Sequence, residues 1–259
     1  MERFQAGAHW TGRKESAEDC ARRAALLFAL LAESDPAYGR WFEYAYSRKN
    51  ALTLPFEPTR DTFLRFFERK KYRLGRDAFY FDAWTGEEHT GRGGQLHFTC
   101  GSGVPFYANG CLLHLPGAGP TAERVLTVPV LKRVVHALVR AWEPERCVVV
   151  SAADPASKRL AEPGGDCIGW FTYVSRARGR VPSLPRPVRV EPVGSWARSS
   201  PSPPSPSGEK TRRTGRSPRW SASGWRPGAS WRRSRGETQR PNWMFSSTPS
   251  ASGTSGATE

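Results

Sequence analysis

The chain lacks any long hydrophobic run. No apolar stretch approaches the ~20 residues that are needed to span a bilayer, and residues 1–5 lack the apolar core of a signal peptide. The five cysteines, at positions 20, 100, 111, 147 and 167, are odd in number and include no CxxC spacing. Such usage is typical of reduced thiols in a cytosolic protein. We therefore expect a cytoplasmic protein that makes no membrane contact.

The C-terminal part of the chain lacks aliphatic residues. Residues 196–259 contain no Leu, Ile or Val, so they cannot bury enough apolar surface to offset the entropy lost on ordering. They hold 11 Lys/Arg and 3 Asp/Glu, which supplies +8 of the net charge of +15. We predict one folded domain at residues 1–193, followed by a low-complexity tail at 194–259 that is rich in Ser, Arg, Pro and Trp and is disordered.

Helical periodicity is present on both sides of the middle of this domain. Apolar residues recur at steps of three and four between 15 and 33, which predicts an amphipathic helix. Asp35, followed by proline, predicts the cap of a second helix at 35–46. Third and fourth helices are predicted at 59–73 and 128–142.

The middle of the domain has the pattern of strands joined by turns. Three aromatic or branched runs, at 79–86, 95–101 and 109–115, are separated by Gly, Asn, Pro and charged residues. Helices before and after a run of strands predict an α+β domain with a mainly antiparallel sheet packed with several helices. Further strands are predicted at 4–10, 147–151, 168–174 and 188–193.

Two His/Cys pairs in the central strands have the ligand types of a zinc site. His97 and Cys100 are separated by two residues, as are Cys111 and His114. On a strand, however, residues three apart point to opposite faces of the sheet. Neither pair has Gly or Pro between its members to form a turn. We therefore interpret the cysteines as buried and the histidines as half-buried strand residues, and expect no metal or cofactor.

Other catalytic chemistry has little support in the pattern. No local signature of a nucleophile surrounds any cysteine. Carboxylates that could act as a pair in hydrolysis are present, but spacing along the chain does not give their separation in space. These are Asp82, Glu87, Glu88, Asp154 and Asp166. We expect a protein that is not an enzyme.

The basic tail allows two interpretations. Arginines interleaved with tryptophans could bind phosphates and stack on bases, which predicts a nucleic-acid-binding function. The same Ser, Arg, Pro, Gly and Trp composition also arises when GC-rich DNA is read out of frame. The residues concerned are Arg212, Arg213, Arg216, Arg219, Arg226, Arg232, Arg233 and Arg235, with Trp220, Trp225 and Trp231.

A shifted reading frame gives the tail a very different character. With suitable GC-rich codons, residues 194–207 can be read two bases along as Leu-Leu-Gly-Thr-Leu-Ile-Thr-Leu-Thr-Pro-Glu-Pro-Phe. Residues 209–236 can likewise encode a turn and an amphipathic helix. A frameshift near codons 193–195 is therefore a hypothesis that sequencing of the gene would test.

Several short motifs, in their order and spacing, resemble the immunity protein 52 family of bacterial polymorphic toxin systems. The resemblance covers about residues 2–193. Its principal motifs are residues 9–18 (HWTGRKESAE), 20–23 (CARR), 81–86 (FDAWTG), 109–116 (NGCLLHLP) and 169–176 (GWFTYVSR). After Val193, members of the family resemble the shifted-frame reading and not the tail of this chain.

The resemblance implies an α+β protein that is made beside a toxin gene and protects the producing cell by binding and blocking that toxin. The usual neighbour is a toxin with a restriction-endonuclease-like domain, so the implied partner is a DNA-cleaving effector. No catalytic residue and no cofactor are implied. Inhibition would then act by occlusion of the toxin's active site or substrate groove.

One acidic cluster among the central strands is a candidate for contact with such a partner. A nuclease binds DNA through a basic face, so we expect complementary carboxylates on its inhibitor. Asp82, Glu87 and Glu88 form the most concentrated acidic group there, and Trp84 lies among them. The alternatives are that Glu87 and Glu88 belong to a solvated turn and that Trp84 is a core residue; burial statistics favour the core for Trp84.

Overall fold

The structure, a computed structural model, describes residues 3–87, 91–104, 109–154, 168–179, 184 and 188–193, and the backbone of 242–246. Its strands are β1 (Phe4–Trp10), β2 (Trp41–Glu43), β3 (Pro55–Phe56), β4 (Arg73–Leu74), β5 (Ala78–Trp84), β6 (Gln95–Cys100), β7 (Asn109–Leu115), β8 (Arg146–Ser151), β9 (Phe171–Val174), β10 (Arg189–Val193) and β11 (Asn242–Ser246). The helices are α1 (Ala17–Ser34), α2 (Arg48–Ala51), α3 (Arg60–Glu68), α4 (Gly119–Val125) and α5 (Val128–Trp142), with 3-10 turns η1 (Pro36–Tyr38), η2 (Lys70–Tyr72) and η4 (Arg176–Arg178).

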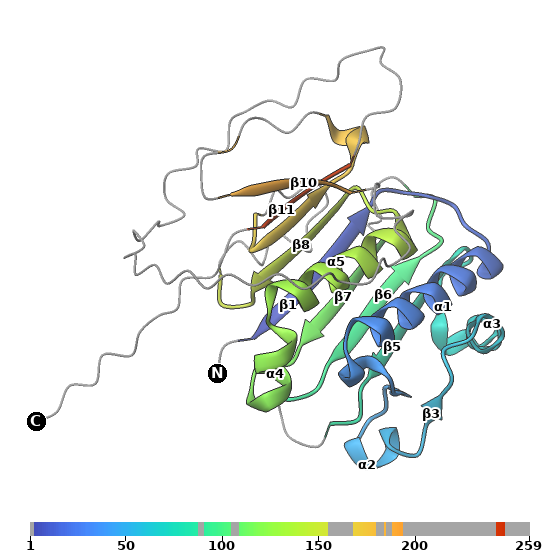
Figure 1. The fold of residues 1–259 in the computed structure, drawn as a ribbon. Helices are drawn as coiled ribbons and strands as arrows, with labels where there is room; N and C mark the ends of the chain where they lie inside the picture. The colour runs from blue at the N-terminus through green and yellow to red at the C-terminus, as the bar shows by residue number, and fades with distance from the viewer. Residues whose placement is uncertain are drawn as a thin grey trace, which may run out of the picture.

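The strands form one sheet in the order β10-β11-β9-β8-β1-β7-β6-β5-β2-β3, with β4 paired to β5. Every pair in this order is antiparallel. β1 lies in the middle, because it pairs with β7 on one side and with β8 on the other. The first strand of the chain therefore joins the predicted central strands to the later ones (Figure 1).

Helices cover one face of this sheet (Figure 1). The apolar stripe of α1, which includes Leu27 and Phe28, and that of α5, which includes Leu131 and Leu138, are buried in one cluster with alternate strand residues. Period-2 alternation of the strands turns every second side chain to these helices. We call this the helix face, and the opposite side the outer face.

A buried ionic network joins the start of α1 to the end of α5. The Glu15 carboxylate contacts Arg13 Nε at 3.2 Å and Arg23 Nε at 2.6 Å. The two arginines also donate to the carbonyls of Trp142 and Ala141, at 2.8 and 2.9 Å. The positive charges of Arg13 and Arg23 interact favourably with the negative end of the α5 dipole. Their N–H groups also satisfy carbonyls that the helix leaves unpaired.

The predicted fold class is confirmed: an antiparallel sheet packs with several helices in an α+β arrangement. The helix predicted at 35–46 is wrong beyond its first turn. Asp35 caps the turn η1 through the Ala37 N–H, but the chain then enters β2, where Phe42 pairs with Trp84. Gly39 ends the turn, and pairing at the sheet edge outweighs the aromatic spacing that indicated a helix.

Part of the tail enters the sheet. β11 lies between β9 and β10 and pairs with both. The rest of 194–259 lies outside the described residues, so the disorder predicted for it stays a prediction. No helix in the described part of the chain has the length and apolar character to cross a membrane.

Candidate partner-binding surface

The outer face of β5, β6 and β7 carries partly exposed side chains, all of them polar or aromatic except Leu112. These are Tyr80, Asp82 and Trp84 on β5, Gln95, His97 and Thr99 on β6, and Leu112 and His114 on β7. The helix-face positions between them hold buried Phe81, Phe98 and Leu113. At β8 the outer face is no longer exposed, because Val148 and Val150 are buried there. The backbone N–H of Trp170 donates to the Val149 carbonyl beside them.

Asp82 and His97 form a pair at the centre of this surface. They lie directly opposite each other in the β5–β6 register, and Asp82 Oδ1 is 2.6 Å from His97 Nδ1. The side chains are 31% and 45% exposed. His114 lies on the next strand, and its pKa is lowered by burial and by the nearby Arg3 and His97. The predicted acidic surface therefore includes one imidazole, that of His97, that contacts the Asp82 carboxylate, and a second imidazole on the next strand.

Trp84 does not belong to the core, so the burial-based interpretation of this residue is wrong. Phe81 and Ala83 take the helix-face positions of β5, which leaves Trp84 partly exposed on the outer face, two residues from Asp82. Its ring lies 6.2 Å from that of Phe42. The Arg48 guanidinium lies 5.4 Å from the ring centroid of Trp84, within cation–π distance.

Glu87 lies close to Trp84 at the start of the β5–β6 connection. Arg48 donates to the Glu87 carbonyl at 2.5 Å, so one guanidinium contacts both residues. Gly93 also packs closely against these two residues. A Cβ at this position would lie 2.8 Å from the Glu87 Cβ and 3.2 Å from the Trp84 Nε1, so glycine fits best there. The structure thus brings Asp82, Trp84 and Glu87 together, whereas Glu88 lies outside the described residues.

The His/Cys pairs do not converge. Cys100 and Cys111 are buried on the helix face, and His97 and His114 lie on the outer face, as strand alternation predicts. Across the ranges that the structure describes, no three His, Cys, Asp or Glu side chains group closely enough to hold a metal ion. Burial raises the pKa of the Cys111 and Cys147 thiols, which disfavours the thiolate that a nucleophile requires.

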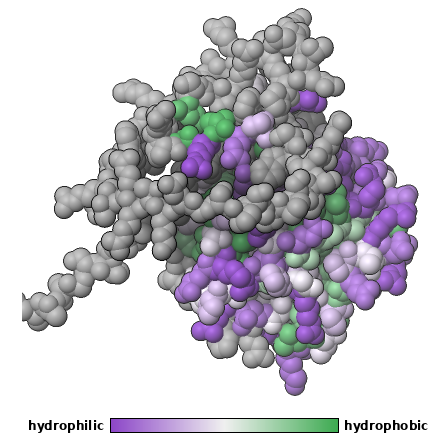
Figure 2. Space-filling model, viewed as in Figure 1, coloured by the Kyte–Doolittle hydropathy of each residue, from purple (hydrophilic) through white to green (hydrophobic). Residues whose placement is uncertain are grey.

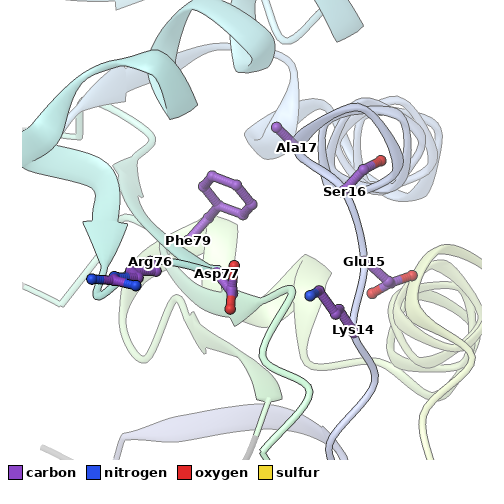
Figure 3. A pocket seen from close by; sticks show the side chains of 7 residues that line it. All are labelled: Lys14, Glu15, Ser16, Ala17, Arg76, Asp77 and Phe79. Atoms are coloured by element: carbon purple, nitrogen blue, oxygen red, sulfur yellow. The ribbon is translucent and has the colours of Figure 1, made fainter.

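A cavity of about 300 Å³ lies at the opposite end of β5, beside the start of α1. It is lined by Lys14, Glu15, Ser16, Ala17, Arg76, Asp77 and Phe79 (Figure 3). Lys14 and Asp77 point toward each other across it, and Glu15 belongs to the network with Arg13 and Arg23. Its charges are mixed, and it is separate from the Asp82–Trp84 surface.

Two contributors to the surface were not predicted. Arg48 comes from a short turn far from β5 in sequence, and no local pattern indicates that it contacts Trp84. The Asp82–His97 contact depends on strand register, which follows from the β5–β6 connection. Pairing Asp82 with candidate positions on the next predicted strand could have found it, if the register had been known.

The fold and this surface define a class of protein: an α+β domain that buries one face of its sheet under helices and presents polar and aromatic side chains on the other. The family model described as immunity protein 52 matches residues 2–197. This chain therefore belongs to the immunity protein 52 family.

No curated protein matches the chain. Among solved structures, it is similar to the Pseudomonas aeruginosa T6SS protein PA0821, with a TM-score of 0.42 and 11% sequence identity. That match covers 69% of this chain and 59% of the other, so the present chain spans less than two thirds of that protein.

Proposed function

We propose that this protein binds and neutralises a cognate toxin and does so without catalysis. The observation that carries the proposal is the family match over residues 2–197, because the family is one of immunity proteins. The toxin we propose is a nuclease with a restriction-endonuclease-like domain, encoded beside the immunity gene. Inhibition takes place in the cytoplasm of the producing cell and occludes the toxin's active site.

The surface around Asp82, Trp84 and Glu87 supports binding of a basic protein face. Trp84 offers a partly exposed aromatic anchor, a residue type that dominates binding energy in protein interfaces. Asp82 and Glu87 lie beside it and complement the cations with which a nuclease holds DNA. Arg48 fixes the ring of Trp84 and the backbone at Glu87, which reduces the ordering cost of association.

Co-expression with the protein encoded by the neighbouring gene tests the proposal. Cells that carry the toxin should survive only when the immunity protein is present, and the purified pair should co-elute and block cleavage of plasmid DNA in vitro. Survival without co-elution would contradict direct binding. Cleavage that continues in the complex would contradict occlusion.

Substitutions test the surface itself. Trp84→Ala, Asp82→Asn and Glu87→Gln should each weaken the complex, and Trp84→Ala most strongly, by about 2 kcal/mol or roughly 30-fold in Kd. Glu123→Gln, an exposed carboxylate on α4, is the matched control and should leave Kd unchanged. Equal affinities for all four variants would place the interface elsewhere.

Nucleic-acid binding through the basic tail is the second candidate function, supported by its arginine and tryptophan content. Removal of the whole tail would also remove β11, so replacement of the eight arginines between 212 and 235 by serine is the cleaner variant. Loss of DNA binding at low salt in this variant would support the second function. Unchanged protection from the toxin would support the first.

A further inference from the structure

The connection between β2 and β3, residues 44–54, exposes an unusual amount of apolar surface. Four of the nine exposed large hydrophobic residues in the described part of the chain lie within it: Tyr44, Tyr46, Leu52 and Leu54. Figure 2 shows a small hydrophobic patch among hydrophilic side chains at the lower end of the molecule, where Figure 1 places α2. Exposed apolar groups that cluster in this way mark interaction sites.

This connection is held in shape by its own hydrogen bonds. Ser47 caps α2 by accepting from the Asn50 N–H, and Thr53 Oγ1 donates to the Asn50 carbonyl at 2.7 Å. The Leu54 N–H donates to the Ala51 carbonyl at 2.9 Å, and Ala51 is buried beneath the turn. The apolar side chains are therefore presented by a preorganised segment, which lowers the entropic cost of binding.

The connection is continuous with the surface around Asp82 and Trp84. The Tyr44 N–H donates to the Asp82 carbonyl at 3.3 Å, which extends the pairing of β2 with β5. Arg48 reaches from α2 to Trp84 and to the Glu87 carbonyl. One partner can therefore cover both regions at once.

The charge of the connection differs in sign from that of the neighbouring carboxylates. Residues 44–54 contain Arg48 and Lys49 and no Asp or Glu. Glu43, which precedes them, is buried and is bound by the Tyr72 hydroxyl and paired with Arg69 and Lys71. The exposed charge around Tyr46 is thus positive, and it complements carboxylates on a partner.

We propose that the β2–β3 connection is the apolar anchor of the toxin interface and docks into a recess on the toxin that is bordered by carboxylates. This inference rests on the proposed function. Tyr46 and Leu52 enter the recess, and Lys49 faces its acidic border. In a nuclease, the carboxylates that bind catalytic metal ions form such a border, so occupation of the recess also blocks the active site.

Alanine substitutions with a matched control test the anchor. Tyr46→Ala and Leu52→Ala should each raise the Kd for the neighbouring gene's toxin at least tenfold, measured by calorimetry or surface plasmon resonance. Leu26→Ala on α1 is the control, because Leu26 and Leu52 are 38% and 36% exposed. It should change Kd less than twofold. Far-UV circular dichroism and thermal unfolding should be the same for all the proteins.

A charge reversal tests the acidic border. Lys49→Glu should weaken binding at least tenfold at low salt and lose part of this effect at high salt, whereas Arg140→Glu on α5 should not. If the unmodified protein does not bind the toxin, the proposed function fails, and this inference fails with it. If the unmodified protein binds tightly and the Tyr46, Leu52 and Lys49 variants bind equally well, only this inference is overturned.

Discussion

His9 lies on the outer face of β1, in a site that leaves its imidazole little room. A Cβ on Gly110 of the adjacent strand would lie 3.2 Å from its Nδ1, and its Nε2 is buried. Burial and the charge of Arg146 lower the pKa of His9 to about 4. The folded protein therefore holds this histidine neutral at pH values where the unfolded chain protonates it, with a pKa near 6.5.

This difference predicts a pH-dependent stability. The unfolded state binds the extra proton as pH falls from about 6.5 to about 4, so the folded state loses stability across that range, by at most about 3 kcal/mol. His9→Phe removes this titrating group and should reduce the loss, while His114 and His136, whose pKa values burial also lowers, keep their share of it. Urea unfolding at pH 7 and pH 4.5 measures both proteins, and equal losses in the two would contradict the prediction.

At the scale of single elements, the Glu15 network predicts how strongly α1 depends on α5. The Glu15 side chain is 8% exposed and contacts two arginines, which in turn bind carbonyls at the end of α5. Glu15→Gln removes the charge that the two guanidinium groups share, although Arg23 keeps its contact with Glu143 at 2.8 Å, and this costs about 2 kcal/mol.

An exposed glutamate in the first turn of α1 provides the comparison. Glu18 pairs with Arg60 at the surface, where such pairs contribute less than about 1 kcal/mol, so Glu18→Gln should change the free energy of unfolding little. Denaturant unfolding at pH 7 compares both variants with the unmodified protein. Similar losses for the two would show that the buried network has no special role.

The longer elements could be predicted from the sequence because their patterns are strong. The stripe of α1, the apolar face of α5 and the alternation of β5–β7 each extend over several residues, and each appears in the structure. The short edge strands β2 and β3 could not, since two or three residues carry no readable period. Tertiary contacts position them instead, because β2 pairs with β5 and β3 pairs with β2.

The candidate surface was predictable only in part, for a related reason. Asp82 and Trp84 share a face of one strand, which alternation alone predicts. Arg48 and His97 reach them through the β2–β5 and β5–β6 pairings, and register is not encoded in any one segment. Average burial predicts Trp84 in the core, because tryptophan is a highly buried residue type. Side chains alternate along β5, however, and Trp84 takes a position on the outer face.

At the scale of the whole molecule, β11 joins β10 to the rest of the sheet. Among the strands that the structure describes, β10 pairs with β11 alone, although Glu191 of β10 also pairs with Lys132 of α5. Deletion of residues 242–259 should therefore free β10 and expose one edge of β9. Hydrogen exchange should speed up at 189–193 and at 171–174, while exchange in β1 and β5–β7 stays slow.

A shorter deletion is the control for that experiment. Removal of residues 247–259 leaves β11 in place and should not change exchange in β9 or β10. Equal protection in the two truncated proteins would show that β10 stays attached without β11.

The position of β11 also bears on how the protein is made. A ribosome releases this strand only after residues 194–241, so one edge of β9 stays without its β11 partner while those residues are translated. An unpaired edge is a template for pairing with another nascent chain. Under the proposed function, any protection that needs the complete sheet therefore begins only after residue 246 has been translated.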